Sequence, residues 1–165
     1  MVSYKFVTDL LRIYKSPTMK HEPVIIERVY EAPVDRVWKA ISDRDEMKKW
    51  YFNVSDFRPE VGFQFQFEGH NEGRTFIHLC TVMEVIRGSK LKYSWTYQGY
   101  EGASYVTWEL FPEGDKTRLR LTHEGLETFP ASPDFARESF LAGWTALIGD
   151  LLPAHLSGKN VPINP

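Results

Sequence analysis

Large aromatic rings alternate with polar side chains in two stretches of the chain, and this pattern predicts β-strands. In "GFQFQFEGH" the rings are those of Phe63, Phe65 and Phe67. In "KYSWTY" they are those of Tyr93, Trp95 and Tyr97. A period of two places the rings of each stretch on one face of a strand and the polar groups on the other. These rings either fill a core or line a cavity, and the function depends on which.

The same periodicity extends over most of the second half of the chain. Strands are expected at about 62–68, 74–86, 90–98, 103–112 and 116–124. The turns between them, such as "HNEGR" and "PEGDK", carry glycine with polar neighbours. Short connections of this kind favour an antiparallel meander over crossover helices.

The segment before this meander predicts one strand and two short helices. "PVIIERVYE" is rich in β-branched residues, as is typical of a strand, and Pro33 then suits the first position of a helix. Ser42 is expected to cap a second short helix. The buried stripe of the first helix is expected to hold Val34, Val37, Trp38 and Ile41. The apolar face of the second is expected to hold Met47, Trp50 and Tyr51.

Helical spacing returns at both ends of the chain. Ser132-Pro133 predicts the start of a long helix that runs to about Leu152, where Pro153 should stop or kink it. Its apolar face includes Phe140 and Trp144, at the centre of the stripe. Residues 1–20 contain apolar residues at roughly helical spacing and predict a short amphipathic helix.

The order of these elements predicts an α+β fold. A curved antiparallel sheet of about six or seven strands, counting the one before the helices, must cover its apolar face. The long C-terminal helix is the element with the length to do so, which gives a helix-grip fold with two short helices after the first strand. We expect an N-terminal extension at 1–22, one domain at 23–158 and a C-terminal tail at 159–165.

Composition narrows the classes of function. The chain of 165 residues has 42% hydrophobic, 25% charged and 15% aromatic residues, which is ordinary for a globular protein except for the aromatic excess. A net charge of -2 argues against nucleic-acid binding. A single cysteine, Cys80, excludes an internal disulfide, and no apolar run suits a signal core or a membrane span. A cytoplasmic protein without membrane insertion is expected.

Several motifs, in the same order along the chain, resemble the START-like superfamily. They are "RVYEAPVDRVWKAISDRDEMKKWYF", "VGFQFQF", "VMEVIRGSKLKYSW", "VTWEL", "TRLRLTHEGL" and "GWTALIGDLL". They are similar to the branch named for the activator of the heat-shock protein 90 ATPase, over roughly residues 24–152. The departures are a single glycine, Gly62, before the "FQF" strand, Pro153 in the last helix, and residues 1–20, which have no counterpart.

The resemblance implies a cavity between the long helix and the concave face of the sheet. Members of the superfamily bind lipids, sterols, polyketides or other small apolar molecules there, and some catalyse reactions. Buried tyrosine and tryptophan are enriched where one end of the side chain is apolar and the other is wet, which favours a cavity over a pure core. The expected ligand-binding residues are Trp50, Phe65, Phe67, Tyr93, Trp95, Tyr97, Trp108, His123 and Trp144.

Two histidines are in phase with inward-facing residues of their predicted strands. His123 is either a satisfied structural histidine or a polar ligand contact at the mouth of the cavity. His78 shares its phase with Cys80, but no further ligands stand at supporting spacing, so no metal site is expected. No nucleophile motif or phosphate loop is evident, so neither a catalytic residue nor a cofactor is expected.

Three functions remain open at this point. The first is binding of one small, largely apolar molecule, aromatic or lipid-like, without catalysis. The second is an enzyme of the polyketide cyclase or dehydratase kind, for which His123 or a tyrosine would have to act as acid or base. The third is a chaperone co-factor that acts through its surface, as the branch name implies. A homodimer is an open alternative to a monomer.

Overall fold

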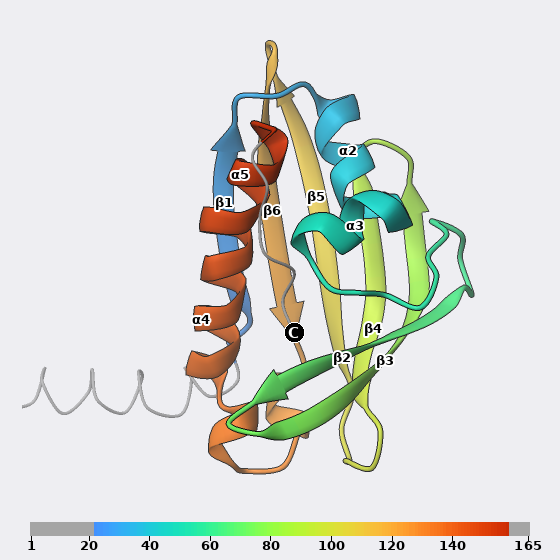
Figure 1. The fold of residues 1–165 in the computed structure, drawn as a ribbon, viewed down its shortest axis with the longest axis vertical. Coiled ribbons are helices and arrows are strands. Elements are labelled where there is room, and N and C mark those ends of the chain that lie inside the picture. The colour runs from blue at the N-terminus through green and yellow to red at the C-terminus, as the bar shows by residue number, and fades with distance from the viewer. Residues whose placement is uncertain (1–21, 159–165) are drawn as a thin grey trace, which may run out of the picture.

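The computed structural model describes residues 22–158, in which a curved antiparallel sheet curls around a C-terminal helix (Figure 1). The helix predicted within residues 1–20 and the tail 159–165 lie outside the described residues. The strands are β1 (Val24–Tyr30), β2 (Gln64–Asn71), β3 (Arg74–Ile86), β4 (Lys90–Tyr97), β5 (Ser104–Glu113) and β6 (Lys116–Glu124). The α-helices are α2 (Val34–Ser42), α3 (Arg44–Trp50), α4 (Arg137–Ala146) and α5 (Leu152–Leu156). The predicted α+β class and helix-grip arrangement are confirmed.

The six strands pair in the order β1-β6-β5-β4-β3-β2, all antiparallel. Strands β2 to β6 pair in chain order as a meander, and β1 pairs with β6 at the opposite edge of the sheet from β2. The β2–β3 hairpin closes through Glu72 and Gly73, whose φ angles are 50° and 81°. A two-residue turn of type I′ needs positive φ at both positions, which explains the glycine.

The pairing register brings the predicted rings to the concave face. Phe67 lies opposite His78 on β3, and His78 lies opposite Tyr97 on β4. A bulge between Val82 and Glu84 interrupts β3 beyond this aromatic region. The bulge therefore does not change which residues of β3 face inward up to Val82.

Two groups of helices cover the concave face (Figure 1). The C-terminal helix lies in front of β1 and β6, and α2 and α3 lie in front of the other half of the sheet. The predicted apolar stripe of α2 is confirmed, since Val37, Trp38 and Ile41 are buried and Val34 packs against the core. Within residues 22–158, no helix combines the length and apolar character needed to cross a bilayer.

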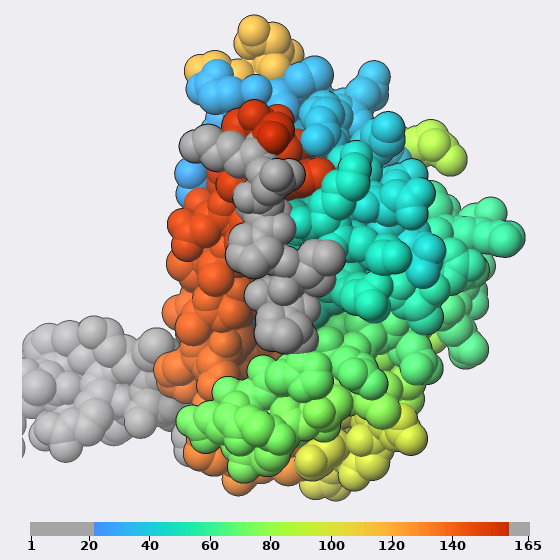
Figure 2. Space-filling model, in the orientation of Figure 1, coloured from blue at the N-terminus to red at the C-terminus, as the bar shows by residue number. Residues whose placement is uncertain are grey.

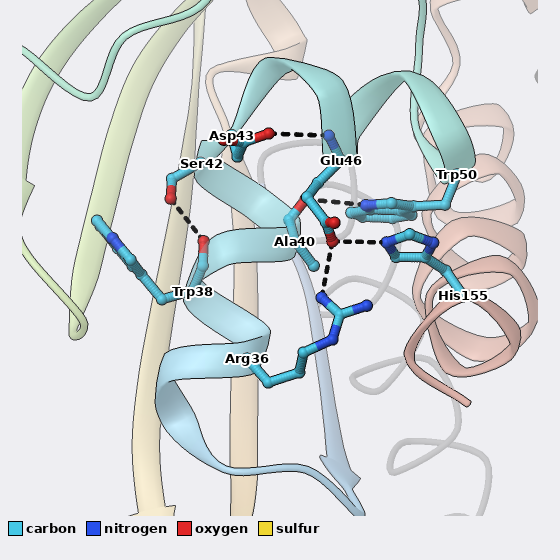
Figure 3. Close-up of polar contacts among 8 residues, drawn as sticks. All are labelled: Arg36, Trp38, Ala40, Ser42, Asp43, Glu46, Trp50 and His155. Carbon is cyan, nitrogen blue, oxygen red and sulfur yellow. Dashed lines mark hydrogen bonds and ion pairs between the residues drawn. The ribbon is translucent and has the colours of Figure 1, made fainter. Parts of the chain in front are cut away.

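The cap of α3 differs from the prediction. Asp43, not Ser42, is the N-cap, and its Oδ1 accepts the Glu46 backbone N–H at 3.0 Å (Figure 3). Ser42 still belongs to the last turn of α2, so its hydroxyl donates back to the Trp38 carbonyl at 2.6 Å. Asp43 has the extended backbone that a cap requires, with φ -108° and ψ 127°.

The C-terminal helix also departs from the prediction, at both ends. Pro133 starts a short 3₁₀ turn, Pro133–Phe135, and Ala136 then adopts an extended conformation, so α4 begins at Arg137. Pro153 does not stop the helix, which continues through a π-helical turn, Leu147–Leu151, into α5. Proline is tolerated here because the wider turn and side chains from β1 satisfy the freed carbonyls.

Two side chains of β1 supply those hydrogen bonds. The Leu152 N–H donates to the Leu147 carbonyl, which leaves the Ile148 carbonyl without its usual helical donor. The Tyr30 hydroxyl donates to the Ile148 carbonyl at 2.6 Å. Arg28 donates to the Gly149 carbonyl, also at 2.6 Å, because Pro153 has no N–H to offer it. The irregular turn is thus fastened to the edge strand.

A shared carboxylate fastens the end of the helix to α2 and α3 (Figure 3). Glu46 Oε1 lies 2.7 Å from Arg36 Nη1 and 2.9 Å from His155 Nε2. The Glu46 side chain is 14% exposed and that of His155 is 8% exposed. Burial opposes ionisation of Glu46, but the hydrogen bonds from His155 and Arg36 outweigh it and lower the pKa of the carboxyl.

Replacing Glu46 by glutamine is expected to destabilise the protein in a pH-dependent way. A carboxyl whose pKa is lowered on folding stabilises the fold above its unfolded pKa, and this contribution is lost as the pH falls through the folded pKa. At pH 7, Glu46→Gln should lower the free energy of unfolding by about 1–3 kcal/mol, the range for hydrogen bonds to a charged group. The difference from the parent should shrink below about pH 4.5.

Urea unfolding between pH 3 and pH 7 measures this difference. Glu101→Gln, at an exposed position, is the matched control and should change little at any pH. A deficit of Glu46→Gln that stays constant over this range would show that the charge on Glu46 does not stabilise the fold.

Candidate functional site

An open cavity of about 490 Å³ lies between α4 and the ends of β2, β3 and β4. Aromatic side chains dominate its walls, among them Phe52, Phe76, Trp95, Tyr97, Phe140 and Trp144. The sheet supplies three of these rings and α4 supplies two, because the inward faces of both elements meet here. The cavity has the volume and mostly apolar lining of a small-molecule site.

The structure divides the nine predicted ligand-binding residues into two groups. Trp95, Tyr97 and Trp144 line the cavity. The others are buried in the surrounding core and do not line it; they are Trp50, Phe65, Phe67, Tyr93, Trp108 and His123. The long rows of rings therefore serve both roles, as core at one end of the sheet and as cavity wall at the other.

A chain of hydrogen bonds accounts for the polar atoms of the core rings. Trp108 Nε1 donates to the Tyr93 hydroxyl at 3.0 Å, and that hydroxyl lies 2.9 Å from the hydroxyl of Tyr51. All three residues are about 1% exposed. Burial raises the pKa of Tyr51 and Tyr93 well above the ordinary value, so both phenols stay protonated. Trp50 is likewise satisfied, with Nε1 donating to the Ala40 carbonyl at 2.9 Å (Figure 3).

His123 has protein partners on both ring nitrogens. Trp144 Nε1 donates to Nδ1 at 3.0 Å, so the ring proton must sit on Nε2, which lies 2.8 Å from the Ser104 hydroxyl. Ser104 in turn donates to the Trp95 carbonyl at 2.8 Å. Burial, with a smaller effect of His78, lowers the pKa of His123 to about 3. This geometry is that of the satisfied structural histidine.

His78 lies on the cavity wall, a role that the sequence did not assign to it. Its Nδ1 lies 3.2 Å from the Phe76 carbonyl, and because a carbonyl only accepts, Nδ1 carries the proton of the neutral ring. Burial lowers the pKa of His78 to about 4, although the carbonyls of Phe67 and Phe76 act in the opposite direction. The inward phase of His78 was visible in the sequence, but an inward residue can face either core or cavity.

Gly69 makes room for the imidazole of His78. A Cβ at residue 69 would stand 2.8 Å from His78 Cε1, closer than real Cβ contacts. Phe67 stacks on the other side, with ring centroids 4.3 Å apart and planes inclined by 15°. The glycine in "FEGH" therefore allows one particular placement of the histidine, and no turn or positive φ requires it.

A polar clamp closes one side of the mouth. Asn71 Nδ2 and Arg74 Nη2, at the tip of the β2–β3 hairpin, lie 2.8 Å and 2.7 Å from Asp134 Oδ1. Asp134 belongs to the 3₁₀ turn before α4. In Figure 2 the hairpin (green) meets the segment leading into α4 (orange) on this face. The ion pair thus joins the two elements that border the cavity.

Within residues 22–158, no group of three or more His, Cys, Asp or Glu side chains is placed to hold a metal ion. His78 and Cys80 both point inward on β3, as their phase predicted. Burial raises the pKa of the Cys80 thiol far above its ordinary value, which disfavours the thiolate that metals and electrophiles require.

Several solved structures share this fold. Protein MLL2253 from Mesorhizobium loti is 24% identical with a TM-score of 0.67, over 85% of this chain and 100% of that chain. CalU16 from Micromonospora echinospora is 29% identical with a TM-score of 0.61, over 81% of this chain and 74% of that chain. DynU16 is 23% identical with a TM-score of 0.68 over 84% of this chain, which spans about half, 49%, of DynU16.

Comparison with curated proteins gave no match. The family model described as "Activator of Hsp90 ATPase homolog 1-like protein" matches residues 31–157, from the end of β1 to the end of α5. The match covers both walls of the cavity and most of the sheet, and it confirms the resemblance to the START-like superfamily. The chain therefore belongs to the family of Activator of Hsp90 ATPase homolog 1-like proteins.

Proposed function

We propose that this chain holds one small, largely apolar molecule, aromatic or lipid-like, in the cavity and does not transform it. The observation that carries the proposal is the open space of about 490 Å³ bounded by aromatic rings from the sheet and α4. Burial of apolar ligand surface against such walls contributes about 25 cal/mol per Å² before the costs of association are subtracted. DynU16 is described as a putative protein in the dynemicin biosynthetic locus, which is compatible with a small-molecule ligand.

The two buried titratable groups on the cavity wall favour binding over catalysis. A general acid or base works best when its pKa lies near the operating pH. The pKa of His78 is lowered to about 4, and burial raises the pKa of Tyr97 well above its ordinary value. Near neutrality His78 is a weak base and Tyr97 a weak acid, so neither suits the cyclase or dehydratase alternative.

The outer surface gives less support to the chaperone co-factor alternative. Exposed apolar side chains on the sheet include Ile25 and Val29 on β1 and Leu79 and Met83 on β3. Three strands separate β1 from β3 in the sheet, so these residues are divided between two regions. A docking patch would require one contiguous apolar area.

Native mass spectrometry of the purified protein, with titration by a neutral apolar fluorophore, tests the proposal. We expect a retained small molecule, or saturable binding of one fluorophore per chain with quenching of tryptophan emission, because Trp95 and Trp144 line the cavity. A retained molecule should be recovered chemically unchanged after incubation. If the native protein retains nothing and the fluorophore does not saturate, the binding proposal is wrong.

A further inference from the structure

The cavity has two polar groups deep in its wall, and they carry no net charge. His78 is 6% exposed and Tyr97 is 8% exposed, whereas His70, Asn71 and Ser139 at the rim are exposed. No lysine or arginine is among the described lining residues, and the acidic Asp134 is held by the clamp at the mouth. A ligand that enters therefore meets apolar rings and two neutral hydrogen-bonding groups.

His78 offers an acceptor. Its Nδ1–H is committed to the Phe76 carbonyl at 3.2 Å, so Nε2 carries the lone pair of the neutral ring. No group within residues 22–158 donates a hydrogen bond to Nε2. The ring is held on two sides, by Phe67 stacked at 4.3 Å and by the edge of Trp95 at 4.8 Å between centroids.

Tyr97 offers a donor. Its hydroxyl oxygen accepts the Trp95 Nε1–H at 2.9 Å, which fixes the ring but leaves the phenolic proton free to donate. None of the residues between 22 and 158 accepts that proton. The ring centroids of Tyr97 and His78 are 4.7 Å apart, so the two side chains are neighbours on the cavity wall.

We propose that His78 and Tyr97 make the cavity selective for an aromatic molecule that carries a neutral hydroxyl group. This inference rests on the proposed function and names the chemical class of the ligand. A hydroxyl both donates to Nε2 and accepts from the Tyr97 hydroxyl, whereas a hydrocarbon leaves both groups without partners. A carboxylate would place its charge beside the Nε2 lone pair in a wall without a cation, and the lowered pKa of His78 keeps that ring neutral at pH 7.

Three ligands that share one ring system separate these cases: 2-naphthol, 2-methylnaphthalene and 2-naphthoate. Competition with the neutral fluorophore measures the dissociation constant of each compound. We expect 2-naphthol to bind about tenfold or more tightly than 2-methylnaphthalene. The hydrocarbon leaves two buried hydrogen-bonding groups without partners, and this loss weakens binding by at least that factor. We expect 2-naphthoate to bind the most weakly.

Variants assign the preference to the two residues. His78→Phe and Tyr97→Phe keep a ring in place and should remove most of the preference for 2-naphthol while 2-methylnaphthalene still binds. Gly69→Ala should act in the same way with every polar group retained, because the added Cβ displaces the imidazole. Tyr105→Phe, on the opposite face of the sheet, is the matched control and should keep the parent's preference.

The outcomes separate this inference from the function on which it rests. Equal binding of 2-naphthol and 2-methylnaphthalene, tightest binding of 2-naphthoate, or an unchanged preference in all three cavity variants would overturn the selectivity and leave the binding function standing. If the fluorophore binds but neither neutral compound displaces it, the selectivity alone fails. If the fluorophore does not bind and no molecule is retained, the binding function fails and the selectivity fails with it.

Discussion

Replacing Trp144 by alanine is expected to lower the free energy of unfolding by about 3–5 kcal/mol, the usual cost of truncating a buried tryptophan. Trp144 is 2% exposed, and its ring lies 5.5 Å from Trp95 and 5.6 Å from Trp108 between centroids. Its Nε1 also donates to His123 Nδ1, which would be left without a donor. The change therefore removes packing between helix and sheet and a buried hydrogen bond at once.

Urea or guanidinium unfolding, monitored by circular dichroism, measures this loss. Trp144→Phe separates the loss of packing from the loss of the hydrogen bond, because this variant retains an aromatic ring and removes the donor to His123. That variant should lower the free energy of unfolding by about 1–3 kcal/mol, the penalty for an unpaired buried acceptor. A loss below about 1 kcal/mol in Trp144→Ala would show that the helix does not cover the sheet as described.

Replacing Gly143 by phenylalanine is expected to weaken binding of the fluorophore by at least about tenfold while the fold persists. Gly143 lines the cavity from α4, and a Cβ at this position would meet no atom within 4 Å. The new ring therefore enters open space and does not overpack a full core. Stability should change by less than about 1 kcal/mol and in the favourable direction, since glycine within a helix is itself destabilising by that order.

Thr145→Phe is the matched control for this substitution. Thr145 lies on an exposed face of α4 and is not among the described lining residues. The two variants add a ring of the same size to the same helix, so only the one in the cavity should affect binding. If Gly143→Phe binds the fluorophore as tightly as Thr145→Phe, the ligand site lies elsewhere.

The sheet was predictable from the sequence because its alternation is regular. Rings at every second position of β2 and β4 predicted which face is buried, and short glycine turns predicted the antiparallel order. The bulge in β3 follows Val82, beyond the aromatic region, so it did not invalidate these assignments. The details that failed, the cap of α3 and the continuation past Pro153, depend on local backbone geometry and on partners from β1.

The cavity was less predictable than the fold. Alternation shows that Tyr93 and Tyr97 face inward, but it does not show where the overlying helices end. Tyr93 lies beneath Tyr51, at the end of α3, and is fully covered, whereas Tyr97, four residues further on, borders open space. For the same reason His78 and Phe52 were not identified, since their exposure to the cavity depends on the placement of α4 and of the loop after α3.

The attachment of the π-helical turn to β1 has a consequence for how the cavity accommodates ligands of different size. Sliding the helix along its axis would separate Tyr30 from the Ile148 carbonyl, and a buried carbonyl without a donor costs about 1–3 kcal/mol. The wall that carries Gly143 and Trp144 is therefore held in a fixed position along the sheet. The opposite wall is attached at its tip by an exposed ion pair, Arg74 to Asp134, which is worth far less in water. We expect larger ligands to be accommodated by outward displacement of the β2–β3 hairpin, with the helix staying in place.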